Sequence, residues 1–166
     1  MKVYTKTGDA GTTAKYSGER VPKDDPIIII GGKIDNLLAA LDSSIVVIKD
    51  KEIKTLLEDI EKKLWQTAGE ISLGGKGKKV NDTIKEAHIT EFEALIDKYN
   101  QKINFFIRFT TETSTRLNEA RVRCRDLEVF LTPLFRENKL RPEVYKYINR
   151  LSDLLYVLAC YTEKLA

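Results

Sequence analysis

The residues best suited to chemistry lie near the N-terminus, in residues 4–13 and 18–24. The first stretch reads Tyr4-Thr5-Lys6-Thr7-Gly8-Asp9-Ala10-Gly11-Thr12-Thr13, and the second reads Gly18-Glu19-Arg20-Val21-Pro22-Lys23-Asp24. Glycines let backbone N–H groups approach an anion, threonine hydroxyls donate hydrogen bonds or hold a metal, and the lysines supply positive charge. The segment has neither helical nor strand periodicity, and we expect a phosphate-binding loop. Gly-Asp-x-Gly also occurs in ordinary turns, so a purely structural turn is the alternative.

A second polar group falls within a helical pattern later in the chain. Arg121, Arg125 and Glu128 are spaced i, i+4 and i+7, so they share a face beside the apolar stripe that contains Cys124. Two guanidinium groups next to a core cost desolvation energy unless an anion meets them. The spacing therefore predicts that they bind a carboxylate or a phosphate.

Their partners remain open at this level. Asp35 is a candidate structural partner for the arginines, and Glu128 could hold an arginine, a metal or a ribose hydroxyl. The alternative is an ordinary exposed charge network with Asp126 and Glu119. Further along, Asn149 and Asp153 lie one turn apart in an otherwise apolar helix, which indicates either a helix contact or a site.

The apolar pattern predicts an all-α fold, a five-helix up-and-down bundle that follows an irregular N-terminal phosphate-binding loop. We expect one domain over residues 1–166, with residues 1–30 as the nucleotide-binding segment and residues 31–166 as the bundle. Gly31-Gly32 is interpreted as a helix entry and Gly74 to Lys79 as a helix exit. Asp82-Thr83 with Glu86 forms a possible capping box for the third helix. The five apolar series begin at Ile34, Ile53, Ile84, Leu117 and Val144.

Composition excludes several classes of protein. The 28 basic and 25 acidic residues are too balanced for general nucleic-acid binding, so any anion site must be local. The longest apolar run, Ile27–Ile30, is far too short to span a membrane, and the N-terminus lacks the pattern of a signal peptide. We therefore expect a cytosolic protein without a membrane association.

The sequence gives little support for a zinc site, a disulfide or a catalytic triad. Cys124 and Cys160 lack CxxC spacing and fall in helical patterns, which indicates buried apolar residues. His88 is the only histidine, which argues against a multi-histidine centre or a Ser-His-Asp triad. We expect it to be a surface or packing residue. Trp65, Tyr145 and Tyr147 are interpreted as packing residues.

Four motifs in order resemble those of the PduO-type ATP:cob(I)alamin adenosyltransferases. They are the N-terminal loop, Gly32-Lys33-Ile34-Asp35, the helix Ala120-Arg121-Val122-Arg123-Cys124-Arg125-Asp126-Leu127-Glu128, and Tyr147-Ile148-Asn149-Arg150-Leu151-Ser152-Asp153. The resemblance implies a homotrimer of five-helix bundles with each active site between subunits. The family moves the 5'-deoxyadenosyl group of ATP onto the cobalt of reduced cobalamin and releases triphosphate.

The resemblance also implies roles for individual residues. The phosphates would be wrapped by Thr7, Gly8, Asp9, Gly11, Thr12 and Thr13, with charge added by Lys6 and Lys23. Arg125, Glu128 and Asn149 match nucleotide contacts, and Arg121 and Asp35 match an ion pair near the site. Phe105 aligns with an aromatic residue that excludes the lower axial ligand of the corrinoid, and Phe106 and Phe109 lie close by. Mg²⁺ would sit on the triphosphate, held by phosphate oxygens and water, with no protein metal site of its own.

The chain departs from the family pattern at several positions. The family's Phe-Ile-Leu-Pro-Gly-Gly loop reads Phe105-Phe106-Ile107-Arg108-Phe109-Thr110. A histidine of the fourth helix is replaced by Asn118, the second arginine of an Arg-Arg pair by Asp126, and a further arginine by Val129. One phosphate-facing charge is lost and another is reversed.

Three hypotheses follow. The first is a working adenosyltransferase, and the second is a non-catalytic paralogue that binds ATP or carries a corrinoid. The third is a structural helical trimer whose N-terminal loop has no ligand. Whether a reductase partner delivers the electron to cobalt is left open.

Overall fold

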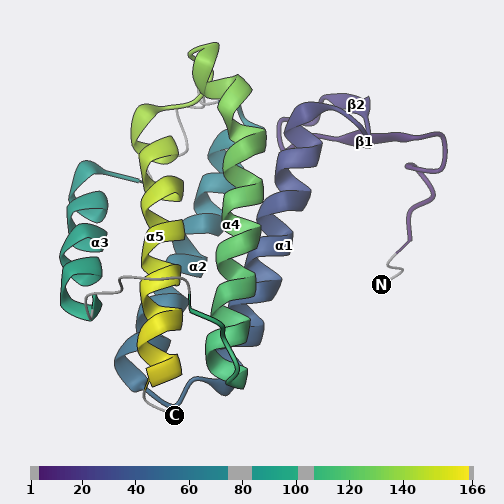
Figure 1. The fold of residues 1–166 in the computed structure, drawn as a ribbon. Helices are drawn as coiled ribbons and strands as arrows, with labels where there is room; N and C mark the ends of the chain where they lie inside the picture. The colour runs from purple at the N-terminus through teal and green to yellow at the C-terminus, as the bar shows by residue number, and fades with distance from the viewer. Residues whose placement is uncertain (1–3, 75–83, 101–106, 165–166) are drawn as a thin grey trace.

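The computed structural model describes residues 4–74, 84–100 and 107–164, and within them the chain forms five helices and one two-stranded hairpin (Figure 1). The predicted five-helix fold is confirmed. The elements are β1 (Thr12–Ala14), β2 (Arg20–Pro22), α1 (Pro26–Val47), α2 (Lys51–Ser72), α3 (Glu86–Tyr99), α4 (Glu112–Arg136) and α5 (Pro142–Lys164).

Helix α4, which carries Arg121 and Arg125, packs between two other helices. It packs against α5 on one side and α1 on the other, while α1 also packs on α2 and α3 lies against the outer side of α5 (Figure 1). The apolar stripe predicted for α4 is confirmed, because all of its members are fully buried: Leu117, Ala120, Cys124, Leu127 and Leu131. The rotation of α4 about its axis is therefore fixed, and the edge that carries Arg121 and Arg125 must lie beside this stripe.

Helix α1 begins earlier than the sequence suggested. The side chain of Asp25 accepts a hydrogen bond from the Ile27 N–H at 2.9 Å, and Pro26 occupies the first turn, where its missing N–H costs nothing. The four isoleucines and Gly31-Gly32 are therefore inside the helix, which is 22 residues long rather than about 16. Glycine inside a helix is unfavourable, but burial of Ile30 and Ile34 on the same helix offsets that cost.

The start of α3 also differs from the expectation. Asp82 and Thr83 lie outside the described residues, and the helix begins at Glu86. His88 has a defined role here, because its Nδ1 accepts a hydrogen bond from the Lys85 N–H at 3.1 Å. Burial lowers the pKa of His88, which favours the neutral imidazole that can accept this bond.

The segment before α1 contains an antiparallel hairpin, where the sequence had indicated no regular structure. Thr13 pairs with Val21, and Gly18 takes a φ of +87° in the connecting turn. The Tyr16 N–H donates to Ser72 Oγ at 3.0 Å, which attaches the hairpin to the end of α2. Strands of three residues are too short to give a clear alternating pattern.

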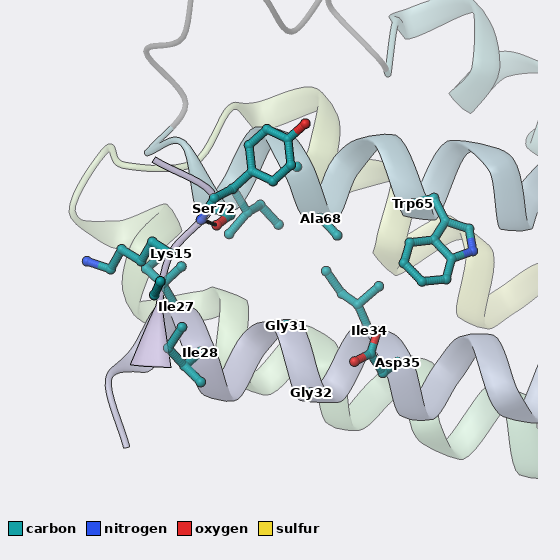
Figure 2. Close-up of a pocket in the computed structure, with 14 residues that line it drawn as sticks. Lys15, Ile27, Ile28, Gly31, Gly32, Ile34, Asp35, Trp65, Ala68 and Ser72 are labelled. Atoms are coloured by element: carbon teal, nitrogen blue, oxygen red, sulfur yellow. Dashed lines mark hydrogen bonds between the residues drawn. The ribbon is translucent and has the colours of Figure 1, made fainter. Parts of the chain in front are cut away.

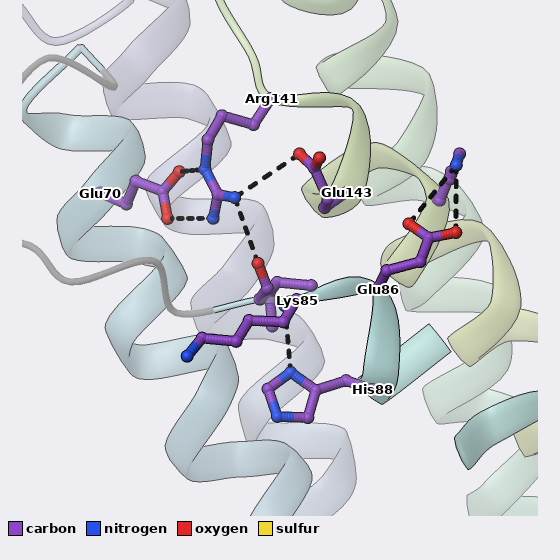
Figure 3. A network of polar contacts seen from close by, with 8 residues as sticks. Glu70, Lys85, Glu86, His88, Arg141 and Glu143 are labelled. Atoms are coloured by element: carbon purple, nitrogen blue, oxygen red, sulfur yellow. Dashed lines mark hydrogen bonds and ion pairs between the residues drawn. The ribbon is translucent and has the colours of Figure 1, made fainter. Parts of the chain in front are cut away.

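A charged cluster joins residues that are 71 positions apart in the sequence, Glu70 and Arg141. The Arg141 guanidinium donates to both carboxylate oxygens of Glu70 at 2.6 and 3.1 Å and to the Ile84 carbonyl at 3.1 Å (Figure 3). It also lies 3.5 Å from the Glu143 carboxylate. These contacts of Arg141 with Glu70, Ile84 and Glu143, which we call the Arg141 clasp, connect α2, the segment before α3 and the start of α5.

Several smaller expectations can be compared with the structure. Gly74 follows α2 with a φ of +71°, as expected for a helix exit, and both cysteines are buried. Tyr147 is fully buried and stacks on Phe92, but Trp65 is 63% exposed, so its interpretation as a packing residue is wrong. In the described part of the chain no helix combines the length and hydrophobicity that a membrane span needs.

Candidate functional site

The first polar group is an arm formed by residues 4–11, which extends from β1 away from the helices (Figure 1). Within it the Asp9 N–H bonds to the Lys6 carbonyl at 3.4 Å, and the Gly11 N–H bonds to the Gly8 carbonyl at 3.2 Å. Lys6 has a φ of +60°, which is unusual for a residue with a side chain. These two N–H groups are thus used in turns, so side chains and the remaining N–H groups are left to meet an anion.

Lysine and arginine side chains support the arm from β2. A Cβ added at Gly8 would lie 3.3 Å from Lys23 Nζ, so a larger residue there would displace the ammonium group. The Lys23 N–H donates to the Gly11 carbonyl at 2.9 Å. Arg20 donates to the Thr7 carbonyl at 2.7 Å and to Thr12 Oγ1 at 2.6 Å. A role for Arg20 was not predicted, although Arg20 lies inside the motif of residues 18–24.

The second polar group surrounds a cavity of about 510 Å³ between α4, α5 and the residues before α4. Its lining combines charged, polar and aromatic side chains: Ile107, Phe109, Asn118, Arg121, Arg125, Ser152, Asp153 and Tyr156. The structure thus brings Arg121, Arg125 and Asp153 to one cavity. Tyr156 was missed, although it lies one turn after Ser152 and its position on α5 could have indicated it.

Arg121 is held at this cavity by two contacts. Its Nε donates to Asn118 Oδ1 at 2.8 Å, and its guanidinium carbon lies 5.7 Å from the centre of the Tyr156 ring. Burial raises the pKa of the Tyr156 hydroxyl, so the ring stays neutral beneath the cation. Asn118, which replaces the family's histidine, therefore orients the arginine.

The exposed charge network that was the alternative exists, but it leaves these two arginines out. Arg123 pairs with Glu119 at 3.4 Å, and Asp126 pairs with Lys33 of α1 at 2.8 Å. Within the described residues Arg125 makes no hydrogen bond or ion pair, and it is exposed. A guanidinium without a partner at a cavity is available to an external anion.

Glu128 and Asn149, the other two predicted nucleotide contacts, are bonded to one another. Asn149 Nδ2 donates to Glu128 Oε1 at 3.0 Å across the α4 and α5 contact. Asn149 Oδ1 accepts from Arg150 Nη1 at 3.0 Å, which fixes the orientation of the amide. The polar patch of α5 therefore makes a helix contact through Asn149, while Ser152 and Asp153 line the cavity, and its role as a site stays a prediction.

Asp35 lies at a different cavity, of about 710 Å³, between β1, α1 and α2 (Figure 2). Gly31 and Gly32 contribute no side chains to this space, and Trp65 lines it from α2. The cavity is next to the hairpin, since Lys15 also contributes to its wall.

Within the described part of one chain Asp35 and Arg121 do not form an ion pair, and their pairing stays a prediction. Lys33 faces α4, where it meets Asp126. Two residues on, the helix has turned by about 200°, so Asp35 faces the other way, toward α2. Phe105 lies outside the described residues, and so does Phe106.

Comparison with known proteins decides the family. The model of the cobalamin adenosyltransferase family matches residues 3–162. This chain belongs to the cobalamin adenosyltransferase family. It is 35% identical over 96% of its length to the corrinoid adenosyltransferase PduO of Salmonella typhimurium, and it spans 49% of that relative. It is 34% identical to a corrinoid adenosyltransferase of Citrobacter freundii and spans 93% of that protein. The chain thus covers about half the length of PduO relatives such as the one from Salmonella.

Solved structures of the family agree with the fold. A variant PduO-type ATP:corrinoid adenosyltransferase from Lactobacillus reuteri, complexed with cobalamin and ATP, superposes with a TM-score of 0.88 at 27% identity, covering 99% of this chain and 92% of that one. A second variant from that organism, complexed with ATP, gives 0.87 at 28% identity over 99% of this chain and 95% of that one. Both relatives of this adenosyltransferase-family chain bind the nucleotide that the arm and the arginines were expected to hold.

Proposed function

We propose that this protein transfers the 5'-deoxyadenosyl group of ATP to the cobalt of cob(I)alamin and releases triphosphate. The observation that carries the proposal is Arg125, an exposed cation without a partner in the described chain, beside the bonded pair of Glu128 and Asn149. Family membership supports the same reaction. Lys6 of the arm and Lys23, whose ammonium lies next to Gly8 of the arm, supply the second cationic group.

The chemistry asks the protein for alignment and charge neutralisation. The cobalt supplies an electron pair to C5', a Co–C bond forms, and the C5'–O bond breaks as triphosphate leaves with its electron pair. No proton transfer is needed at carbon. Arg125 and the lysines of the arm would stabilise the negative charge that accumulates on triphosphate, while Glu128 and Asn149 would orient the nucleoside.

Mg²⁺ would enter this site bound to the nucleotide. In the described residues no group of three or more His, Cys, Asp or Glu side chains could hold a metal. The ion would be bound by triphosphate oxygens and water, and the hydroxyls of Thr12 and Thr13 in β1, next to the arm, could supply further oxygen ligands. Bound there, it would supply further charge neutralisation for the leaving group.

We also propose that the protein acts as a homotrimer with each site between two subunits. In one chain the arm extends away from α1, whereas Arg125 faces the cavity of α4 and α5 (Figure 1). Exposed apolar side chains flank Arg125 on α4, with Val122 49% exposed and Val129 67% exposed. A neighbouring subunit that covers this stripe would bring its own arm to the arginine.

Turnover and nucleotide binding test the proposal together. Chemically reduced cobalamin, incubated with the protein, ATP and Mg²⁺, should be converted to adenosylcobalamin. The change in the absorbance spectrum measures this conversion. Arg125→Ala should weaken ATP binding in calorimetry by about tenfold or more, because one charge-assisted contact is lost. The matched control is Arg123→Ala, since Arg123 lies on the same helix and pairs only with Glu119 in the described chain. Binding of ATP without turnover in a single-turnover assay would support the non-catalytic paralogue instead.

A further inference from the structure

The carboxylate of Glu163, near the end of α5, gathers hydrogen bonds from the segment that precedes α4. The backbone N–H of Thr110 donates to both of its oxygens at 3.1 and 3.0 Å, and the N–H of Thr111 donates at 3.1 Å. The hydroxyls of Thr110 and Ser114 donate to the same carboxylate. One half-buried carboxylate thus receives five hydrogen bonds from residues 110–114.

Capping of α4 does not by itself account for this cluster. Thr111 already caps the helix, since its Oγ1 accepts from the Ser114 N–H at 3.2 Å. Glu163 instead binds the N–H groups of the cap residue and of the residue before it, which lie outside the helix. What it fixes is therefore the course of the chain through Phe109 and Thr110.

The fixed segment forms one wall of the cavity that contains the arginines. Phe109 lines that cavity and meets the Tyr156 ring edge to face, with centroids 6.2 Å apart and an interplanar angle of 84°. Tyr156 in turn lies beneath Arg121. Glu163 follows Tyr156 by two helical turns, so both project from the same face of α5.

The sequence of this wall explains why an external anchor is needed. The segment reads Ile107-Arg108-Phe109-Thr110-Thr111 and contains no proline. Without proline, no ring fixes the backbone there, and the loop depends on hydrogen bonds for its conformation.

We infer that Glu163 is a positioning residue: by anchoring Thr110 and Thr111 it holds Phe109 against Tyr156, and we place the corrinoid of the proposed reaction on the apolar wall that these two rings form. This inference rests on the proposed function. The anchor persists through neutral and mildly acidic solutions, because the hydrogen bonds from Ser114 and Thr110 lower the pKa of Glu163 to about 2. Glu163 is not among the lining residues of the cavity, so its effect on substrates is indirect.

The test compares Glu163→Gln and Glu163→Ala with the parent in the full chain. We expect the KM for cob(I)alamin to rise by about tenfold while the Kd for ATP changes less than about twofold, since the wall shifts but the arginines remain. Hydrogen exchange in a peptide covering residues 107–114 should speed up, while exchange in α1 and α2 stays as in the parent. Glu91→Gln is the matched control, because Glu91 is exposed on α3 and forms no hydrogen bond or ion pair within the described residues.

Thr110→Val provides a second, milder way to weaken the anchor. It removes one hydroxyl donor and keeps Glu163, so combined with Glu163→Ala it should add little to the effect on KM. Equal losses of ATP and corrinoid affinity, or unchanged exchange in residues 107–114, would overturn the inference.

The experiment also separates this inference from the proposed function. If the parent does not turn over, the proposed reaction fails, but titration with cob(II)alamin followed by visible absorbance still tests the wall. Weaker cob(II)alamin binding in Glu163→Gln would then support the positioning role, and unchanged binding would reject it.

Discussion

At position 126 the charge is reversed relative to the family pattern, and the structure neutralises the new negative charge of Asp126. Where the family carries an arginine, Asp126 forms an ion pair with Lys33 at 2.8 Å, and the Lys33 ammonium also lies 4.6 Å from the centre of the Phe130 ring. The negative charge is thus neutralised by α1 before it can act on a nearby phosphate.

Glu61 gives a prediction about pH at the residue scale. Its Oε1 is buried without a hydrogen-bond partner in the described chain, and burial together with the nearby Asp42 carboxylate raises the pKa of Glu61 to about 7 from 4.5. Between these two values the folded chain retains a proton that the unfolded chain has released, so this group lowers stability as the pH rises through that window. Glu61→Gln should therefore be more stable than the parent at pH 8, by about 1 kcal/mol after allowance for partial exposure.

Urea unfolding at pH 5 and pH 8 measures this difference. At pH 5 the two proteins should unfold at similar urea concentrations, because the folded parent is then protonated at Glu61. The exposed Glu91→Gln variant should show no such gain at pH 8. An equal gain for both variants would indicate a general effect of net charge.

At the scale of elements, the Arg141 clasp joins α2 to the residue that precedes α5. The Glu70 side chain is only 9% exposed and receives two hydrogen bonds from Arg141. Arg141→Met should cost about 3 kcal/mol of unfolding free energy, because a buried carboxylate loses its bidentate partner. Denaturation in urea, monitored by circular dichroism, provides the measurement.

The control and the counter-test for the clasp use the same assay. Lys62→Met breaks an exposed pair with Asp59 and should change stability little. The double variant Arg141→Met with Glu70→Met should recover part of the loss, since no charge remains buried. A double variant that is as unstable as the sum of the two single changes would contradict this account of the clasp.

At the scale of the whole molecule, the proposed trimer predicts complementation between two inactive variants. Lys23→Glu disables the arm and Arg125→Ala disables the α4 edge, so either one alone should abolish most turnover. Assemblies co-expressed from both variants contain interfaces that pair an intact arm with an intact arginine, about a quarter of all interfaces at equal mixing. Activity should therefore return in the mixed assemblies to about that fraction of the parent.

Mixed assemblies purified with two different affinity tags make the measurement direct. Homo-oligomers of each variant, prepared separately and combined just before the assay, are the control. A mixed assembly that stays inactive would mean that the arm and Arg125 of one chain serve the same site.

The residues along each helix were enough to predict five helices, because an apolar period near 3.6 depends only on local spacing. The buried stripe of α4 and the neighbouring edge of Arg121 and Arg125 followed from that period alone. The early start of α1 did not follow, since burial of Ile30 and Ile34 against other helices overrides the poor helix propensity of Gly31 and Gly32.

What the sequence alone determined was the set of polar residues and the helical edge on which each would lie, because a helix assigns faces by spacing. Only the tertiary structure decided which edges meet: Lys33 rather than Asp35 faces α4, Asn149 bonds to Glu128, and Glu163 anchors a segment 53 residues earlier. Such contacts depend on the rotation and height of one helix against another. Those quantities are fixed by the packing of the whole core and are not encoded in any single stretch of sequence.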